Sequence, residues 1–363
     1  MFHITVTGSP AIDDKVFPDL PFQTSDTKIV LIAPLRIQQK MKIFGIIAKL
    51  TALFLLAGQS HAAPSDQKVE DSPRFHDPST PILQGGTWYC FSTGNGISTR
   101  TSLDLKTWKE ARPAFNGFPA WHREVIPDHR GYLWAPDIIQ RDSRYLLYYS
   151  VSGWGKNISA IGLASSPTLD PKDPAYHWKD EGIVIRSGRE DPYNAIDPQL
   201  FADPDGGLWM VFGSFWTGIQ LIELDPKTGL RHAGHRQAHQ LAWNESIEAP
   251  ALLKHGDYYY LFVNWGLCCR GLKSTYEIRV GRSRKITGPY LDADGNELAT
   301  GGGSLFLKSE GNRVGPGHAS FIKEDDGIRM FYHYYDRQRD GFASIGSLSV
   351  RWTDEGWPTL RPF

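Results

Sequence analysis

The chain has 363 residues, of which 40% are hydrophobic, 12% aromatic and 22% charged, and its formal net charge is −1. This composition is that of a globular protein with a full apolar core, and it excludes a disordered or collagen-like chain. A chain without net positive charge lacks the basic footprint of nucleic-acid binders, so we expect a neutral partner and no nucleic acid.

The N-terminal part of the chain has the pattern of a secretory signal peptide. Residues 41–63 combine a positive start at Lys42, an apolar run, and small residues that end in Ala62 and Ala63. The apolar run is shorter than the ~20 residues that span a bilayer, which disfavours a membrane anchor. Because a signal peptide begins a protein, we expect residues 1–40 to be a start-site artefact, with a poorly ordered extension as the alternative. The mature protein is expected to be secreted or periplasmic, without a membrane attachment.

Residues 64–363 contain an internal repeat of five segments. Each segment has an acidic residue or His, a short apolar run, a turn and an aromatic-rich strand, and a third strand follows. The leading residues, at spacings of 60, 60, 51 and 70, are Asp77, Asp137, Asp197, Glu248 and His318. Short strands between turn clusters, with no helical period, indicate an all-β protein. A repeat of this length with three or four strands predicts a five-bladed β-propeller that fills the mature chain.

The repeat also predicts where a functional site lies. The first strand of each propeller blade lines the central channel, so the five leading residues are expected to converge at one mouth of the channel. Carboxylates that converge in a concave site are costly unless they bind charge or share protons, and they therefore mark a candidate active site.

The chemistry that suits such a site is the hydrolysis of a glycosidic bond. This reaction needs one protonated and one ionised carboxyl, and a third carboxylate keeps the acid protonated by repulsion. Asp77, Asp197 and Glu248 can supply these parts. Structural alternatives stay open, because Asp-Pro is a common turn opening at Asp77 and Asp197, and Glu248 could be a paired charge.

Several motifs run in order from about residue 73 to the C-terminus. They include Phe75-His-Asp-Pro-Ser79, Trp134-Ala-Pro-Asp-Ile138, Asn194-Ala-Ile-Asp-Pro-Gln199, Phe212-Gly-Ser-Phe-Trp-Thr-Gly-Ile219, Ser246-Ile-Glu-Ala-Pro250, Asn264-Trp-Gly-Leu-Cys-Cys-Arg-Gly271 and Gly315-Pro-Gly-His318. Together these motifs resemble those of the arabinanases of glycoside hydrolase family 43. The Asn-Trp-Gly-x-Cys-Cys and Phe-Trp-Thr-Gly segments are similar to those of endo-1,5-α-L-arabinanases in particular.

The resemblance implies a role for each leading residue. Asp77 corresponds to the general base of an inverting reaction, Glu248 to the general acid, and Asp197 to the carboxylate that tunes the acid and orients the substrate. His318 corresponds to a residue associated with one calcium ion in the channel. Imidazole is a poor ligand for this cation, so waters would complete its shell, and a core histidine is the alternative. Asp137 is expected to be structural or channel-lining.

The resemblance also implies a substrate and a mode of action. The expected partner is arabinan or arabino-oligosaccharides, cleaved by an endo-acting monomer without an organic cofactor. The alternatives are an exo-acting arabinanase, an arabinofuranosidase or a β-xylosidase, and more distantly a carbohydrate-binding propeller without catalysis. The expected substrate-binding residues, whose aromatic members could equally be core, are Trp134, Asn194, Ser214, Phe215, Asn264 and Trp265.

Three cysteines, Cys90, Cys268 and Cys269, make no disulfide framework. Adjacent cysteines could form only a strained vicinal bridge. We therefore expect structural or pocket-lining thiols.

Overall fold

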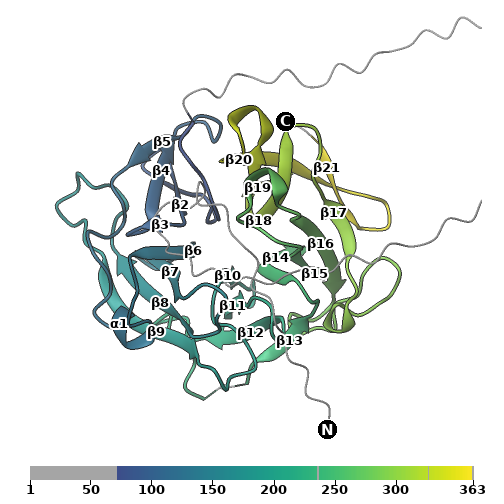
Figure 1. Cartoon of the computed structure of the whole chain (residues 1–363), viewed down its shortest axis with the longest axis horizontal. Helices are drawn as coiled ribbons and strands as arrows, with labels where there is room; N and C mark the ends of the chain where they lie inside the picture. Colours follow the sequence, from purple (N-terminus) through teal and green to yellow (C-terminus); the bar gives the residue numbers. More distant parts are fainter. Residues whose placement is uncertain (1–71, 235–236, 326, 362–363) are drawn as a thin grey trace, which may run out of the picture.

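The structure, a computed structural model, describes residues 72–361 except residues 235–236 and 326. Its strands form five antiparallel sheets that stand as blades around a central axis (Figure 1). The predicted all-β class and the five-bladed β-propeller are thereby confirmed. The predicted extension and signal peptide, residues 1–63, lie outside the described residues. Among the residues that are described, no helix is long and apolar enough to cross a membrane.

The main strands of each blade follow one another in the chain, and one short strand from the blade 1 segment joins the sheet of blade 2. Blade 1 has β1 (Ile82–Gln84), β2 (Thr87–Ser92), β4 (Ser98–Ser102) and β5 (Lys109–Ala111). Blade 2 has β6 (Tyr132–Arg141), β7 (Arg144–Ser152), β8 (Ser159–Ser166) and β9 (Lys179–Ser187), and β3 (Gly94–Asn95) pairs with β6. Blade 3 has β10 (Gln199–Ala202), β11 (Leu208–Phe212), β12 (Ile219–Leu224) and β13 (His239–Ala242). Blade 4 has β14 (Ile247–His255), β15 (Tyr258–Trp265), β16 (Glu277–Ser283) and β17 (Ser304–Leu307). Blade 5 has β18 (Arg313–Glu324), β19 (Gly327–Asp336), β20 (Phe342–Trp352) and β21 (Pro358–Arg361).

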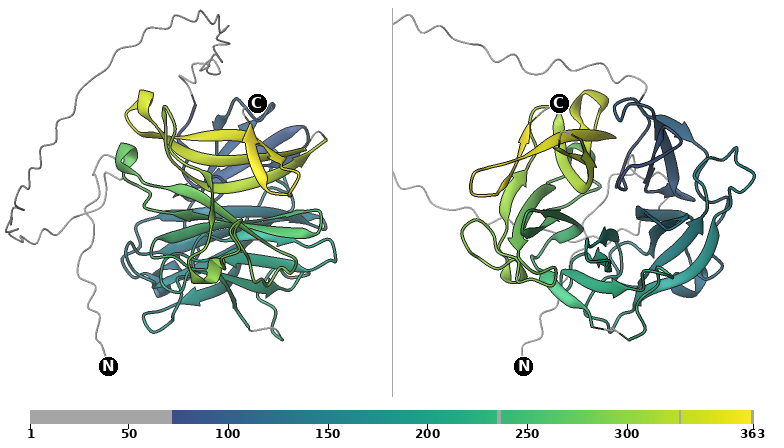
Figure 2. Two further views of the ribbon diagram at one scale, coloured as in Figure 1. Left: turned by 90° about the vertical axis from the view of Figure 1, so that its right-hand side faces the viewer. Right: turned by 180° about the vertical axis from the view of Figure 1, so that it is seen from behind.

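Helical turns are short and lie in the connections. They are α1 (His122–Val125), η1 (Gly271–Lys273), η2 (Leu298–Thr300) and η3 (Arg337–Arg339). The first strand of each blade lies nearest the axis and the last one at the rim, as Figure 1 shows for β6 to β9 and β14 to β17. Figure 2 shows the blades side by side in the ring, with blades 1 and 5 as neighbours.

The core of the protein lies between blades. Successive side chains of a strand point to opposite faces, so one strand serves two neighbouring cores. In β7, Leu147 and Tyr149 pack toward blade 1, whereas Leu146 and Tyr148 pack toward blade 3. Because both faces of β7 are buried, its sequence is a nearly continuous apolar run and does not alternate between apolar and polar residues.

Within residues 72–361, blades 1 and 5 share no strand where the ring closes between them. The Phe75 N–H donates to the carbonyl oxygen of Ala343 at 2.9 Å. The fully buried Phe75 ring packs in a cluster that contains Trp108 of blade 1 and Phe331 of blade 5. The segment that closes the ring therefore runs directly into His76 and Asp77.

Candidate active site

One residue at the inner edge of each blade has a left-handed backbone. These residues, with φ between 46° and 58°, are Asp77, Ala135, Asp197, Ala249 and His318. Non-glycine residues rarely adopt this conformation, which occurs most often at turns and functional sites. The ladders of β6, β14 and β18 shift register at these points, so the inner strands bulge there.

The backbone N–H of each of these residues donates a hydrogen bond to a side chain of the preceding blade. The acceptors are His333 Nδ1 for Asp77 (3.2 Å), Thr93 Oγ1 for Ala135 (2.8 Å), Ser150 Oγ for Asp197 (3.1 Å), Asp197 Oδ2 for Ala249 (3.1 Å) and Asn264 Oδ1 for His318 (2.9 Å). The five blades therefore present equivalent backbone positions at one mouth of the channel.

This geometry corrects the predicted register for two leading residues. Glu248 precedes the left-handed position of its blade by one residue, and Asp137 follows it by two. Asp137 is 3% exposed, and its carboxylate accepts the N–H groups of Thr80 (2.9 Å) and Leu200 (2.8 Å). Asp137 thus ties blade 2 to blades 1 and 3, which agrees with a structural role.

Asp77 lies among three histidines. One carboxylate oxygen, Oδ2, accepts the Thr93 hydroxyl at 2.5 Å and lies 2.8 Å from His76 Nδ1. The other oxygen, Oδ1, lies 3.5 Å from the Nδ1 atoms of His318 and His333. Burial by itself raises the pKa of Asp77, but the three histidines outweigh burial and hold that pKa well below its ordinary value. Asp77 is therefore ionised at neutral pH.

Asp197 and Glu248 are buried and interact electrostatically. Burial raises the pKa of both carboxyls, and the repulsion between them further raises that of Asp197, so the pair retains a proton more readily than Asp77 does. The Ser214 hydroxyl donates to Glu248 Oε2 at 2.7 Å, and the Tyr276 hydroxyl contacts Glu248 Oε1. These two hydroxyls lower the pKa of Glu248, but the net direction stays upward.

Two predicted substrate-binding residues have their amides engaged within the protein. Asn264 is 1% exposed, and its Nδ2 group donates to the carbonyl oxygens of Pro316 (3.2 Å) and Glu277 (3.3 Å) while Oδ1 holds the His318 N–H. Asn194 Oδ1 accepts the Ser159 hydroxyl at 2.7 Å. The hydrogen bonds of Asn264 indicate that it positions its neighbours. Among the predicted polar residues, Ser214 contacts the carboxyl pair through Glu248.

The predicted aromatic residues differ in exposure. Trp265 packs against the core between blades 3 and 4 under the Arg279 guanidinium, which lies 4.6 Å from its ring centre. Trp134 is partly exposed and stands edge-on to Trp154, whose side chain is 42% exposed. Because Trp134 pairs with Ser150, the residue that holds Asp197, these two tryptophans lie at the carboxylate end of blade 2.

A second exposed aromatic group lies beside Glu248. The Phe215 N–H donates to the carbonyl oxygen of Ile247 at 2.7 Å, and the next residue, Trp216, is 41% exposed. The Trp243 indole donates to the Trp216 carbonyl oxygen at 3.0 Å. Trp154, Trp216 and Trp243 were missed from the sequence, where no signal separates an exposed tryptophan from a buried one.

The cysteine prediction was wrong for two of the three residues. Cys268 and Cys269 form a vicinal disulfide, whereas Cys90 is a free, buried thiol. Cys269 lies beside the Asp77 site, with its Sγ atom 3.7 Å from His76 Nε2.

The donor atoms around Asp77 do not match the predicted calcium ion. Of the described residues, His76, Asp77 and His333 form a group whose ligand atoms lie within 4.8 Å of one another. His76 Nε2 and His333 Nδ1 are engaged by the Tyr335 hydroxyl and the Asp77 N–H, whereas His76 Nδ1 and His333 Nε2 have no hydrogen-bond partner within the part of the chain that the structure describes. Calcium requires six to eight oxygen ligands, so these residues do not form a calcium cage. The Nδ1 atom of His318 lies 3.5 Å from Asp77 Oδ1, and its other ring nitrogen, Nε2, can offer one ligand to a hydrated cation.

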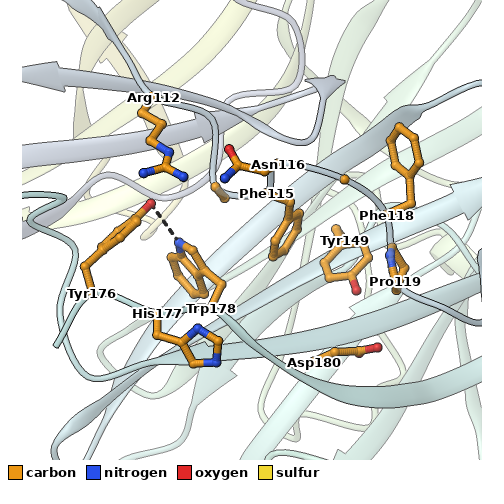
Figure 3. Close-up of a pocket in the computed structure, with 12 residues that line it drawn as sticks. Arg112, Phe115, Asn116, Phe118, Pro119, Tyr149, Tyr176, His177, Trp178 and Asp180 are labelled. Carbon is orange, nitrogen blue, oxygen red and sulfur yellow. Dashed lines mark hydrogen bonds between the residues drawn. The ribbon is translucent and has the colours of Figure 1, made fainter. Parts of the chain in front are cut away.

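A separate cleft of about 330 Å³ lies at the rim between blades 1 and 2. Aromatic side chains line it, and the Trp178 indole donates to the Tyr176 hydroxyl at 3.1 Å (Figure 3). None of the predicted site residues lines this cleft. The candidate active site is therefore the channel mouth.

A five-bladed propeller that brings together an ionised carboxylate and a proton-retaining carboxyl pair has the parts of a propeller glycoside hydrolase. Residues 72–358 match the family described as glycosyl hydrolases family 43. The chain belongs to this family and is a glycoside hydrolase, so the resemblance stated from its motifs is confirmed.

Individual relatives are similar over most of the chain. An extracellular exo-α-(1→5)-L-arabinofuranosidase of Cellvibrio japonicus is 44% identical over 299 residues, which cover 78% of this chain and 86% of that protein. An extracellular endo-α-(1→5)-L-arabinanase of Bacillus subtilis is 40% identical over 290 residues, which cover 78% of this chain and 87% of that protein. The solved structure of Cellvibrio cellulosa α-L-arabinanase complexed with arabinohexaose matches with a TM-score of 0.76 and 42% identity, over 80% of this chain and 96% of that one.

Proposed function

We propose that the protein is an inverting endo-arabinanase that hydrolyses α-1,5-L-arabinofuranosidic bonds of arabinan, a side chain of pectin. The observation that carries the proposal is the contrast between two carboxyls from separate blades, Asp77 among three histidines and Glu248 buried against the Ser214 and Tyr276 hydroxyls. Asp77 of blade 1 is held ionised, whereas Glu248 of blade 4 is biased toward its protonated form. The arabinan-active relatives support this choice of substrate.

In this reaction the two carboxyls act on opposite sides of the scissile bond. Asp77 removes a proton from a water molecule, whose oxygen attacks the anomeric carbon of the arabinofuranosyl ring. Glu248 donates its proton to the departing glycosidic oxygen as the carbon–oxygen bond breaks. The new reducing end has the inverted configuration, and exchange with solvent returns the proton from Asp77 to Glu248.

Asp197 supports the acid in two ways. The two buried carboxyls repel each other when both are ionised, so the pair retains a proton, and Asp197 Oδ2 accepts the N–H of Ala249, the residue next to the acid. Ser214 and Tyr276 fix both oxygens of Glu248. Trp134 and Trp154 on one side, and Phe215 and Trp216 on the other, are suited to stack on arabinofuranose rings.

The proposal is tested with purified protein and linear arabinan. The wild type is expected to release a ladder of short oligosaccharides, and Glu248→Gln is expected to lose about 10²- to 10⁴-fold in kcat, the range of a general acid. A wild-type protein that leaves both linear and debranched arabinan intact would remove the proposal.

An exo-acting mode is the second candidate, because the relative that is 44% identical is an exo-acting arabinofuranosidase. Chromatography of early products separates the two modes. Random cleavage shortens long chains quickly and gives a descending ladder, whereas exo action releases one small product from the first minutes onward.

Two further features belong to the proposal. We propose that one hydrated calcium ion binds to His318 below the sugar, where its charge would stabilise the ionised form of Asp77. We also propose that the protein is exported from the cell and is a monomer. The names of its extracellular relatives and the signal-peptide pattern support the export. Chelator-dependent activity and mass measurement of the exported protein test these points.

A further inference from the structure

The base side of the site contains a chain of polar contacts that starts at the disulfide. The backbone N–H of Cys269 donates to the Tyr335 hydroxyl at 2.7 Å. The same hydroxyl lies 2.8 Å from His76 Nε2, and the opposite ring nitrogen of His76, Nδ1, lies 2.8 Å from Asp77 Oδ2. The contacts join blade 4, blade 5 and the segment ahead of blade 1, and all four residues are buried or nearly so.

These contacts assign the proton on His76. A bare Nδ1 would place its lone pair 2.8 Å from an anionic oxygen, so Nδ1 carries the proton, although its N–H is not aligned for a hydrogen bond to Asp77 Oδ2. In the neutral ring, Nε2 is then an acceptor. The Tyr335 oxygen already accepts the Cys269 N–H, and its own proton is free to go to Nε2. Burial raises the pKa of Tyr335, so this hydroxyl keeps its proton.

The His76 ring is also fixed in its plane. It stacks on His333, with ring centres 4.1 Å apart and planes inclined by 23°. His76 and the Thr93 hydroxyl both occupy the Oδ2 side of Asp77. Oδ1 lies farther from its histidine neighbours, 3.5 Å from the Nδ1 atoms of His318 and His333, and is therefore the oxygen that accepts the proton of a water molecule.

We propose that Tyr335, anchored by the Cys268–Cys269 disulfide loop, is a positioning residue for Asp77 and acts through His76. This inference rests on the proposed role of Asp77 as the base. Without the Tyr335 hydroxyl, the His76 ring loses the partner that fixes its tautomer and tilt, and the carboxylate can turn Oδ2 toward the water.

The test uses two substrates that differ in whether Glu248 must protonate the leaving group. Linear arabinan has a sugar leaving group, which must be protonated. A dinitrophenyl arabinobioside has a leaving group that departs without protonation, but water must still be activated. Tyr335→Phe is expected to lose about 10-fold in kcat on both substrates with little change in KM, a fraction of what a general base contributes.

Two other buried tyrosines give matched controls. Tyr276→Phe removes the hydroxyl that contacts Glu248, so its loss is expected on arabinan and is expected to disappear on the dinitrophenyl substrate. Tyr332→Phe, on the same strand as Tyr335 but bonded to Arg313, is expected to keep wild-type rates on both.

A double-mutant cycle tests the route through His76. An asparagine amide can replace Nδ1 as a donor to Asp77 but offers nothing to Tyr335. Tyr335→Phe is therefore expected to cost about 10-fold in the wild type and less than about 2-fold in the His76→Asn background. Equal losses in the two backgrounds would show that Tyr335 does not act through His76.

The outcomes separate this inference from the proposed function. A wild type that is inactive on both substrates overturns the proposed function. An active wild type with a fully active Tyr335→Phe, or with a loss confined to arabinan, overturns the inference. Should Tyr335→Phe fail to fold, the Cys268→Ser/Cys269→Ser variant replaces it, because releasing the loop is expected to give the same equal loss on both substrates.

Discussion

Replacement of Asn264 by alanine separates a positioning role from a substrate-binding role. The side chain is 1% exposed, and its Oδ1 atom is the acceptor for the His318 N–H at 2.9 Å. Loss of that acceptor leaves a buried donor unsatisfied, which costs about 1–3 kcal/mol. The two carbonyl oxygens that Nδ2 reaches add a smaller cost, so we expect Asn264→Ala to lower the free energy of unfolding by about 2–4 kcal/mol.

Urea denaturation followed by circular dichroism measures this change, and the kinetics of arabinan hydrolysis accompany it. We expect kcat to fall because His318 loses the bond that fixes its left-handed backbone beside Asp77. Asn264→Asp is the matched variant, because its carboxylate can still accept the His318 N–H, and we expect it to keep part of both stability and rate. A stability within about 0.5 kcal/mol of wild type, together with a raised KM, would refute this reasoning and restore the substrate-binding interpretation.

Three further predictions concern other parts of the site. Ser214→Ala removes a hydrogen bond that favours ionised Glu248, so we expect the pKa of Glu248 to rise further. The basic limb of the pH–rate profile then moves to higher pH, and a shift to lower pH would contradict this assignment. Trp154→Ala removes an exposed ring, so KM for arabinan should rise about 10-fold, the equivalent of ~1.4 kcal/mol, while the urea midpoint stays unchanged; an unaltered KM would exclude this ring from binding. Treatment with chelator should lower the rate of arabinan hydrolysis by the wild type, and added calcium should restore that rate. The His318→Ala variant should respond to neither treatment. A wild-type rate that chelator does not change would argue against a cation at His318.

The repeat made the fold and most of the carboxylates predictable. Asp77 and Asp197 occupy equivalent left-handed positions, so a pattern of leading residues was enough to find them. The register failed at Glu248 and Asp137 because bulges shift the inner strands by one or two residues, and a sequence pattern does not contain φ angles. Blade spacing alone therefore could not tell the structural Asp137 from the residues at the channel mouth.

The supporting residues could not be predicted, because they come from the second strands and loops of other blades. His333 and Tyr335 lie more than 250 positions from Asp77, and their hydrogen bonds depend on ring closure between blades 1 and 5. Cys268 and Cys269 are adjacent in sequence, but their pairing depends on the loop conformation that places Cys269 against Tyr335. Long-range contacts of this kind need a three-dimensional structure.

The most direct measurement is proton NMR of linear arabinan during digestion by the wild-type protein. Water activated by Asp77 opposite the proton donor Glu248 must reach the anomeric carbon from the side away from the leaving oxygen. New reducing ends should therefore appear first as the β-anomer and equilibrate later. Initial accumulation of the α-anomer would mean that a carboxylate attacks the sugar itself, and the assignment of Asp77 as a base toward water would fall.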